Sequence, residues 1–130
     1  MSHILVVDDD PAIRDVVVDI LEMSNYSVST ATNGAEALEQ MRRDAPHAVM
    51  LDLMMPVMSG WDFLRACQRD PACQGVPIVV MSAARDAASV ADELGAHAFL
   101  SKPFELDNML SVMGQLAPPP GRPADGTPEG

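Results

Sequence analysis

The chain has 130 residues, is 48% hydrophobic and carries a formal net charge of −11 at pH 7. This length suits one hydrophobic core and is too short for two ordinary domains. Because a nucleic-acid-binding surface needs positive charge, direct binding to nucleic acid is not expected. No apolar run approaches the roughly 20 residues that span a bilayer, and the N-terminus lacks a signal-peptide pattern, so we expect a cytoplasmic protein without membrane contact.

The first part of the chain predicts three strands, each followed by a helix. The strands are expected at His3–Val7, Ser27–Ala31 and His47–Leu51. Apolar residues three and four positions apart predict the helices: Ile13, Val16, Val17 and Ile20, then Leu38 and Met41, then Gly60, Phe63, Leu64 and Cys67. Three residues have the character and position of N-caps: Asp10, Asn33 and Ser59.

The second part predicts two further strands and two further helices. The strands are expected at Pro77–Met81 and Ala98–Leu100. The helices are marked by Ala87, Val90, Ala91 and Leu94, with Gly95 at the end, and by Leu106, Met109, Leu110 and Met113. Residues 118–130 contain five Pro and three Gly, so we expect a folded domain at residues 1–117 and a flexible tail or linker stub after it.

Strands that alternate with helices through short connections predict an α/β fold with a parallel sheet. Helices would cover both faces of such a sheet, which explains why the predicted strands are continuously apolar. The fold class expected is therefore a single doubly wound domain of five strand–helix units.

Cys67 and Cys73 are the only cysteines of the chain. They lie six residues apart and have no histidine nearby at a spacing typical of metal ligands. In the cytoplasm such cysteines are normally reduced, so we expect two free thiols and no zinc site.

Polar residues follow the ends of four predicted strands. They are Asp8, Asp9, Asp52, Ser82, Ser101 and Lys102, and Lys102 is the only lysine of a chain with seven arginines. In an open parallel sheet, ligands bind beyond the carboxyl ends of the strands, where neighbouring connections leave on opposite faces. We therefore expect three carboxylates, a hydroxyl and an ammonium to converge there.

Neighbouring carboxylates need a positive partner, because two of them about 4 Å apart repel by roughly 4 kcal/mol at an effective dielectric constant near 20. Lys102 supplies one charge, and the surplus of anionic oxygens suits Mg²⁺, with Mn²⁺ as a second possibility. Asp10, directly before Pro11, is better explained as the helix N-cap. A carboxylate such as Asp52 can also act as a nucleophile toward a phosphoryl group, with Lys102 neutralising the phosphoryl charge and Ser82 donating a hydrogen bond.

Four segments resemble the receiver domain of two-component response regulators. They are "ILVVDDD", "VMLDLMMPVMSG", "IVVMSA" and "AFLSKPF", and the similarity runs from about residue 2 to 117. The resemblance implies a flavodoxin-like fold with strand order 2-1-3-4-5. It also implies a phosphorylation-controlled signalling switch, not an enzyme beyond its own phosphorylation and slow dephosphorylation. The implied donor is a histidine kinase or a phosphotransfer protein, and the implied output is a downstream protein target, with phosphorylation-dependent dimerisation possible.

The resemblance also implies roles for individual residues. Asp52 matches the phosphoacceptor, and Asp8, Asp9 and the backbone carbonyl of Met54 match the other metal ligands. Lys102 matches the family's active-site cation, and the Lys102–Pro103 bond matches its cis peptide. Ser82 and Phe99 match the hydroxyl and the aromatic ring that move inward on phosphorylation.

Two features depart from the commonest family pattern. Met54 and Ala84, which border the phosphoryl group in the family, are apolar here and cannot orient an attacking water. We therefore expect slow self-dephosphorylation. The segment from Ser82 to Gly95 is about two residues shorter than usual, so the fourth helix or the loop before it should be trimmed, and the output face should differ from the usual one.

Two other functions fit parts of the sequence. Asp8 and Asp10 match the D-x-D motif of phosphohydrolases of the haloacid dehalogenase type, but no further acidic strand end follows Lys102, and no substrate cap is present. An interaction module that is never phosphorylated is the third reading. The complete set of acids, hydroxyl and lysine argues against it.

Overall fold

The computed structural model of the chain describes residues 2–83, 87–102 and 105–117. The predicted tail at residues 118–130 lies outside this range. Strands and helices alternate within it: β1 (His3–Val7), α1 (Pro11–Met23), β2 (Ser27–Ala31), α2 (Gly34–Arg43), β3 (Ala48–Asp52), α3 (Gly60–Cys67), the short 3₁₀ helix η1 (Pro71–Cys73), β4 (Ile78–Ser82), α4 (Ala87–Glu93), β5 (Ala98–Ser101) and α5 (Leu106–Leu116).

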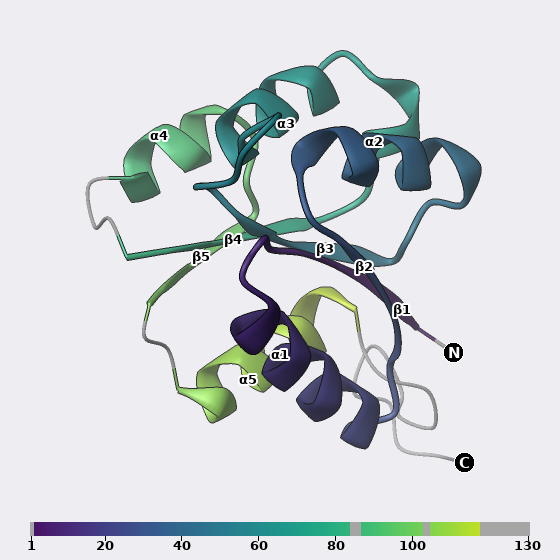
Figure 1. Ribbon diagram of the computed structural model, residues 1–130, viewed down its shortest axis with the longest axis vertical. Helices are drawn as coiled ribbons and strands as arrows, with labels where there is room; N and C mark the ends of the chain where they lie inside the picture. The colour runs from purple at the N-terminus through teal and green to yellow at the C-terminus, as the bar shows by residue number, and fades with distance from the viewer. Residues whose placement is uncertain (1, 84–86, 103–104, 118–130) are drawn as a thin grey trace.

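The strands form one parallel sheet in the order β2-β1-β3-β4-β5. Figure 1 shows α1 and α5 together on one face of this sheet and α2, α3 and α4 on the other. The predicted fold class and the strand order 2-1-3-4-5 are both confirmed. Because the chain moves from β1 to β2 in one direction and to β3 in the other, the connections after β1 and β3 leave on opposite faces.

Each face of the sheet has its own hydrophobic core, because neighbouring side chains of a strand point to opposite sides. In β1, Leu5 and Val7 pack under α2 and α3, whereas Ile4 and Val6 pack under α1 and α5. All four side chains are at most 1% exposed. This double burial explains why the sequence of β1 does not alternate between apolar and polar residues.

The three predicted N-caps are confirmed. The side chain of Asp10 accepts a hydrogen bond from Ala12 N–H at the start of α1. The Asn33 side chain accepts a hydrogen bond from Glu36 N–H at the start of α2, and the Ser59 side chain accepts one from Asp62 N–H at the start of α3. These bonds occupy N–H groups that the first helical turn leaves free, which is why residues at these positions reveal the helix starts in the sequence.

The buried face of α1 differs from the one that the apolar spacing indicates. Val17 and Leu21 are the buried residues of α1, whereas Val16 is 54% exposed. The run of three valines contains more apolar side chains than the helix can bury, so its position against the sheet decides which of them face the core. Among the described residues, no helix is both long and apolar enough to cross a membrane.

Three strands continue one residue further than predicted. β3 ends at Asp52, β4 at Ser82 and β5 at Ser101. Strand pairing uses backbone groups, so it continues across Asp52 opposite Met81 and across Ser82 opposite Ser101 although these side chains are polar. The side chains of Asp52 and Ser82, two of the predicted site residues, are therefore held by the sheet itself rather than by a loop.

The prediction of two free thiols is wrong. Cys67, at the end of α3, and Cys73, in η1, form a disulfide bond. The turn after α3 brings their Cα atoms to 5.3 Å from each other, which is within the range that a disulfide needs. Nearby, Arg42 of α2 forms an ion pair of 2.8 Å with Asp70, the N-cap of η1, so the same connection is also tied to α2.

Candidate functional site

The carboxyl ends of β1 and β3 lie side by side at the point where their connections diverge. Asp8 and Asp9 follow β1 directly, and Asp52 is the last residue of β3. One carboxylate oxygen from each of the three residues lies within 4.8 Å of the others. The three acids therefore lie together at the edge of the sheet, as the sequence predicts.

Asp8 is fully buried and held from several sides. Its backbone N–H donates to Ala31 O at 3.1 Å. Its Oδ1 accepts a hydrogen bond from Asp10 N–H at 2.9 Å, and its Oδ2 lies 3.2 Å from Lys102 Nζ. A buried carboxylate is stable only with such partners, so Asp8 is a rigid part of the site.

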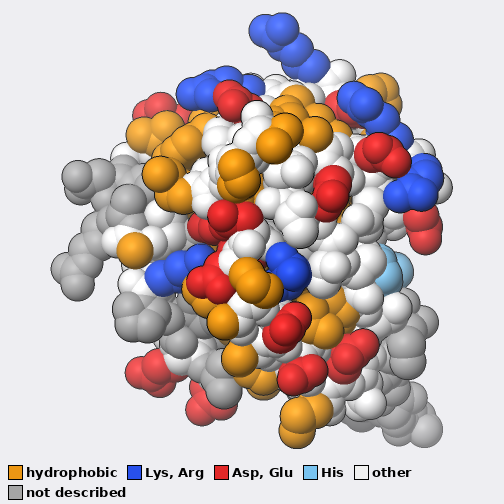
Figure 2. All heavy atoms as spheres, viewed as in Figure 1, with side chains coloured by type: hydrophobic (Ala, Val, Ile, Leu, Met, Phe, Trp, Pro, Cys, Tyr) orange, Lys and Arg blue, Asp and Glu red, His pale blue; other side chains and the backbone are white. Residues whose placement is uncertain are grey.

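Asp52 is influenced by charges of both signs. Burial, followed by the negative charge of Asp8, raises the pKa of Asp52 above its ordinary value, and Asp9 adds a smaller effect in the same direction. The Lys102 ammonium, 3.5 Å from Asp52 Oδ1, and the Met54 N–H, 3.4 Å from it, oppose this rise. Lys102 and Met54 together therefore do not fully offset the combined effect of burial and the neighbouring acids on the pKa of Asp52. Figure 2 shows acidic and basic side chains together near the middle of this face.

The three acids fit a hard divalent cation. Mg²⁺ binds oxygen ligands at about 2.0–2.1 Å, so two ligands on opposite sides of the ion are about 4.2 Å apart. The limit of 4.8 Å between the carboxylate oxygens is close to this span. Asp8 and Asp52 are buried, whereas Asp9 is exposed, so the Asp9 side chain has the most freedom to adjust to an ion.

Ser82 and Lys102 come from the neighbouring strand ends β4 and β5. Ser82 is 4% exposed, and its carbonyl accepts a hydrogen bond of 2.9 Å from Lys102 N–H. Ser101, opposite Ser82, is exposed, and within the described residues it forms no hydrogen bond with the acids, so the structure does not bring it into the cluster. Phe99 is partly buried against the core under α4. Ala84 and the Lys102–Pro103 peptide bond lie outside the described residues.

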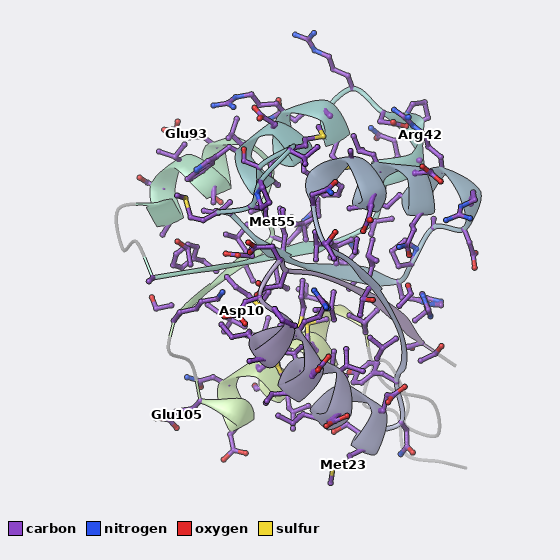
Figure 3. The ribbon with its side chains drawn as sticks, in the orientation of Figure 1. Asp10, Met23, Arg42, Met55, Glu93 and Glu105 are labelled. Atoms are coloured by element: carbon purple, nitrogen blue, oxygen red, sulfur yellow. A yellow bond between two sulfur atoms is a disulfide. The ribbon has the colours of Figure 1, made fainter. Side chains whose placement is uncertain are left out.

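The loop between β3 and α3 starts next to Asp52, and Figure 3 shows its Met55 on the opposite side of the sheet from Asp10. Gly60 packs against the end of β3: its N–H donates to Leu53 O at 3.0 Å, and a Cβ at this position would collide with Asp52 O. At the other end of the loop, Gly34 N–H of α2 donates to Met58 O at 2.8 Å. The loop is therefore anchored to both α2 and β3.

Val57, in the same loop, has a φ of 67° and is 87% exposed. A β-branched residue is strained in this left-handed region, at a cost of roughly 1–2 kcal/mol, whereas asparagine tolerates it better. We expect Val57→Asn to raise the free energy of unfolding by about 1 kcal/mol in urea denaturation. Val16→Asn, on the exposed side of α1, is the control, and it should give no gain; equal effects of the two changes would contradict the strain.

Arg14 also contacts the site, although neither the apolar spacing of α1 nor the polar residues at the strand ends indicate this contact. Its Nη1 donates to the backbone carbonyl of Asp8 at 2.9 Å. A signal for it does exist: Arg14 is the only basic residue of α1 and lies in the first turn, where the helix dipole disfavours a positive charge. A cation at that position indicates electronegative groups close by.

The chain is similar to known proteins over most of its length. The family model of the response regulator receiver domain matches residues 4–113. The response regulator MprA of Mycobacterium leprae (strain TN) is 42% identical over 117 residues, which cover 88% of this chain and 50% of that protein. The DNA-binding dual master transcriptional regulator RpaA of Synechocystis sp. (strain ATCC 27184 / PCC 6803 / Kazusa) is 34% identical over 121 residues, covering 89% of this chain and 49% of that protein. The chain spans about half the length of these curated relatives.

Solved structures give the same result. The chemotaxis response regulator CheY4 of Vibrio cholerae matches with a TM-score of 0.83 and 29% identity, over 89% of this chain and 98% of that one. The family match covers most of the chain, including β1, β3, β4 and β5, whose ends form the site. The chain therefore belongs to the family of response regulator receiver domains.

Proposed function

We propose that this chain is a phosphorylation-controlled signalling switch that accepts a phosphoryl group on Asp52 from a histidine kinase or a phosphotransfer protein. The observation that carries the proposal is the position of Asp52 within 4.8 Å of Asp8 and Asp9 and 3.5 Å from Lys102. A carboxylate nucleophile, an acidic pair and a cation are the groups that phosphoryl transfer to an aspartate requires.

In the proposed transfer, a carboxylate oxygen of Asp52 attacks phosphorus, the P–N bond of the donor phosphohistidine breaks, and the imidazole leaves. Lys102 is close enough to both Asp8 and Asp52 to neutralise an added phosphoryl oxygen. Mg²⁺, held by Asp8, Asp9, Asp52 and the backbone carbonyl of Met54, would offset the phosphoryl charge, and Mn²⁺ would serve similarly. The family is not one of metabolic enzymes, and we assign the chain no other reaction.

Signal output is proposed to use Ser82 and Phe99. A phosphoryl group on Asp52 attracts the Ser82 hydroxyl, and the movement of the β4 end frees space for the Phe99 ring. Support comes from a hollow of about 90 Å³ between α4 and β5, which Phe99, Ala88 and Ala91 help to line. The surface of α4, β5 and α5 would then change shape, with phosphorylation favouring a state that is already sampled.

The test is phosphorylation by acetyl phosphate in Mg²⁺, followed by intact-mass spectrometry. We expect wild type to gain one phosphoryl mass and Asp52→Asn to gain none. Asp62→Asn is the matched control, because Asp62 is an exposed acid of α3 that pairs only with Arg65 among the described residues. An unmodified wild type would contradict the proposal and leave the non-phosphorylated interaction module as the function.

The phosphohydrolase alternative receives no support. Its D-x-D motif requires Asp10 to act on substrate, but the Asp10 carboxylate caps α1 through Ala12 N–H. The family match and the relatives are those of receiver domains.

Partners are proposals as well, because the chain spans only about half of its curated relatives. RpaA is described as DNA-binding. The present chain has a net charge of −11, so we propose that it meets a protein target rather than nucleic acid. Phosphorylation-dependent dimerisation and a cytoplasmic location stay predictions.

Self-dephosphorylation is expected to be slow. Met54 is apolar and 72% exposed at the edge of the site, so its side chain cannot orient an attacking water. After removal of the donor, we expect the phosphoprotein to decay over many minutes or longer in Mg²⁺, followed by intact mass. Met54→Asn, which restores a polar group there, should shorten the lifetime, and a wild-type lifetime of seconds would contradict the prediction.

A further inference from the structure

Arg14 stands out against the charge pattern of α1. The helix carries Asp15, Asp19 and Glu22, and Arg14 is its only basic residue. It occupies the first turn, where the free N–H groups already give the helix end a partial positive charge. An arginine there is unfavourable unless an electronegative group compensates for it.

That group is the backbone carbonyl of Asp8, 2.9 Å from Arg14 Nη1, and the side chain is partly buried around this bond. Among the described residues, Arg14 forms no ion pair with a carboxylate. Arg14 therefore does not occupy the carboxylate oxygens that could bind a cation. Its side chain binds only the backbone carbonyl of Asp8.

The contact closes a small ring around Asp9. The backbone carbonyl of Asp8 accepts a hydrogen bond from the Arg14 side chain, and the Arg14 backbone N–H donates to Asp10 O at 2.9 Å. Asp10 N–H in turn donates to Asp8 Oδ1 at 2.9 Å. The Asp9 carboxylate itself is exposed and makes no hydrogen bond or ion pair within the described part of the chain. Its direction thus depends on the bonds of the residues on either side.

We propose that Arg14 is a positioning residue that holds the turn between β1 and α1 in the shape in which Asp8 and Asp9 bind a divalent cation. The inference rests on the proposed function, because it concerns the same acidic site. Groups that orient metal ligands without touching the metal typically change metal affinity 10- to 100-fold when they are removed.

Replacing Arg14 should change the dissociation constant for Mg²⁺ in opposite directions, depending on whether Arg14 acts through its charge or through positioning. Removing a positive charge beside three carboxylates makes the site more negative, which would tighten Mg²⁺ binding. If Arg14 instead positions Asp8 and Asp9, its replacement should weaken Mg²⁺ binding. The direction of the change in the dissociation constant therefore separates the two roles.

The experiment measures Mg²⁺ binding alone, without phosphodonor, by NMR chemical-shift titration of wild type, Arg14→Met and Arg14→Gln. Arg65→Met is the matched control, since Arg65 is an exposed arginine of α3 paired with Asp62. Measurements are made well below each variant's unfolding midpoint, where a purely stabilising role leaves the dissociation constant unchanged. If Arg14→Met does not fold, Arg14→Gln decides.

We expect the dissociation constant for Mg²⁺ to rise about tenfold in both Arg14 variants and to stay at the wild-type value in Arg65→Met. An unchanged or lower constant in the Arg14 variants would overturn the inference while leaving Asp52 phosphorylation intact. A wild-type protein that binds no Mg²⁺ would overturn both the inference and the metal-dependent function.

Discussion

Replacing Gly60 by alanine is expected to lower the free energy of unfolding by about 3 kcal/mol, because overpacking against groups that cannot rotate away is among the costlier core changes. A Cβ at Gly60 would collide with the carbonyl oxygen of Asp52 and lie 2.7 Å from the Cα of Leu53. Both contacts involve backbone atoms, so relief requires α3 or the end of β3 to shift. The same shift would displace the Asp52 carboxylate from Asp8.

Urea denaturation measures the loss, and Gly114→Ala is the matched control. Gly114 lies within α5, and a Cβ there meets nothing within 4 Å. Alanine inside a helix is favoured over glycine by roughly 0.5–1 kcal/mol, so the control should stabilise the fold. Two glycine-to-alanine changes of opposite sign would identify the close approach of α3 to β3 as the cause. A stable Gly60→Ala protein that is phosphorylated normally would contradict it.

The second large effect is expected for Asp52→Asn without divalent cations. Burial and the charge of Asp8 raise the pKa of Asp52 in the folded protein, so its ionised form opposes folding at neutral pH. Removing that charge relieves the repulsion between Asp52 and Asp8 but also loses the attraction to Lys102. The net result should be a rise in the free energy of unfolding at pH 7 on the order of 1–2 kcal/mol. The change that is expected to abolish phosphorylation should therefore stabilise the metal-free fold.

The pH dependence follows from the same shift. A carboxyl group whose pKa is raised on folding gives its full stability below its unfolded value, near 3.8, and loses that stability as the pH rises through the folded value. The advantage of Asp52→Asn should thus be largest at neutral pH and shrink as the pH falls toward 3.8. Thermal unfolding in EDTA between pH 4 and 8 measures it. An advantage that is independent of pH, or a loss of stability at pH 7, would contradict the assignment.

Added Mg²⁺ provides an internal check on this prediction. A ligand that binds only the folded state stabilises it in proportion to the logarithm of its concentration above the dissociation constant. Wild type should therefore gain stability on addition of Mg²⁺, while Asp52→Asn, which has one carboxylate fewer, should gain less. Asp62→Asn, an exposed site outside the cluster, should follow wild type in both conditions.

The amino-acid sequence determined the features that rest on local chemistry or on a regular pattern. Asp10, Asn33 and Ser59 mark helix starts because a cap acts on N–H groups two or three residues away. The apolar strands separated by helices predict a parallel sheet covered on both faces. The strand order that places β1 beside β3, and so brings Asp8, Asp9 and Asp52 together, came from the family resemblance. The family resemblance added their expected roles.

Only the tertiary structure decided the features that depend on a particular three-dimensional contact. Cys67 and Cys73 pair because the turn after α3 brings them together, and the packing angle of α1 buries Val17 while leaving Val16 exposed. Arg14 meets the Asp8 carbonyl because α1 starts directly beneath the end of β1. A residue pattern records which side chains are apolar or charged, but backbone carbonyls are the same in every residue, so contacts to them become visible only when the chain is folded.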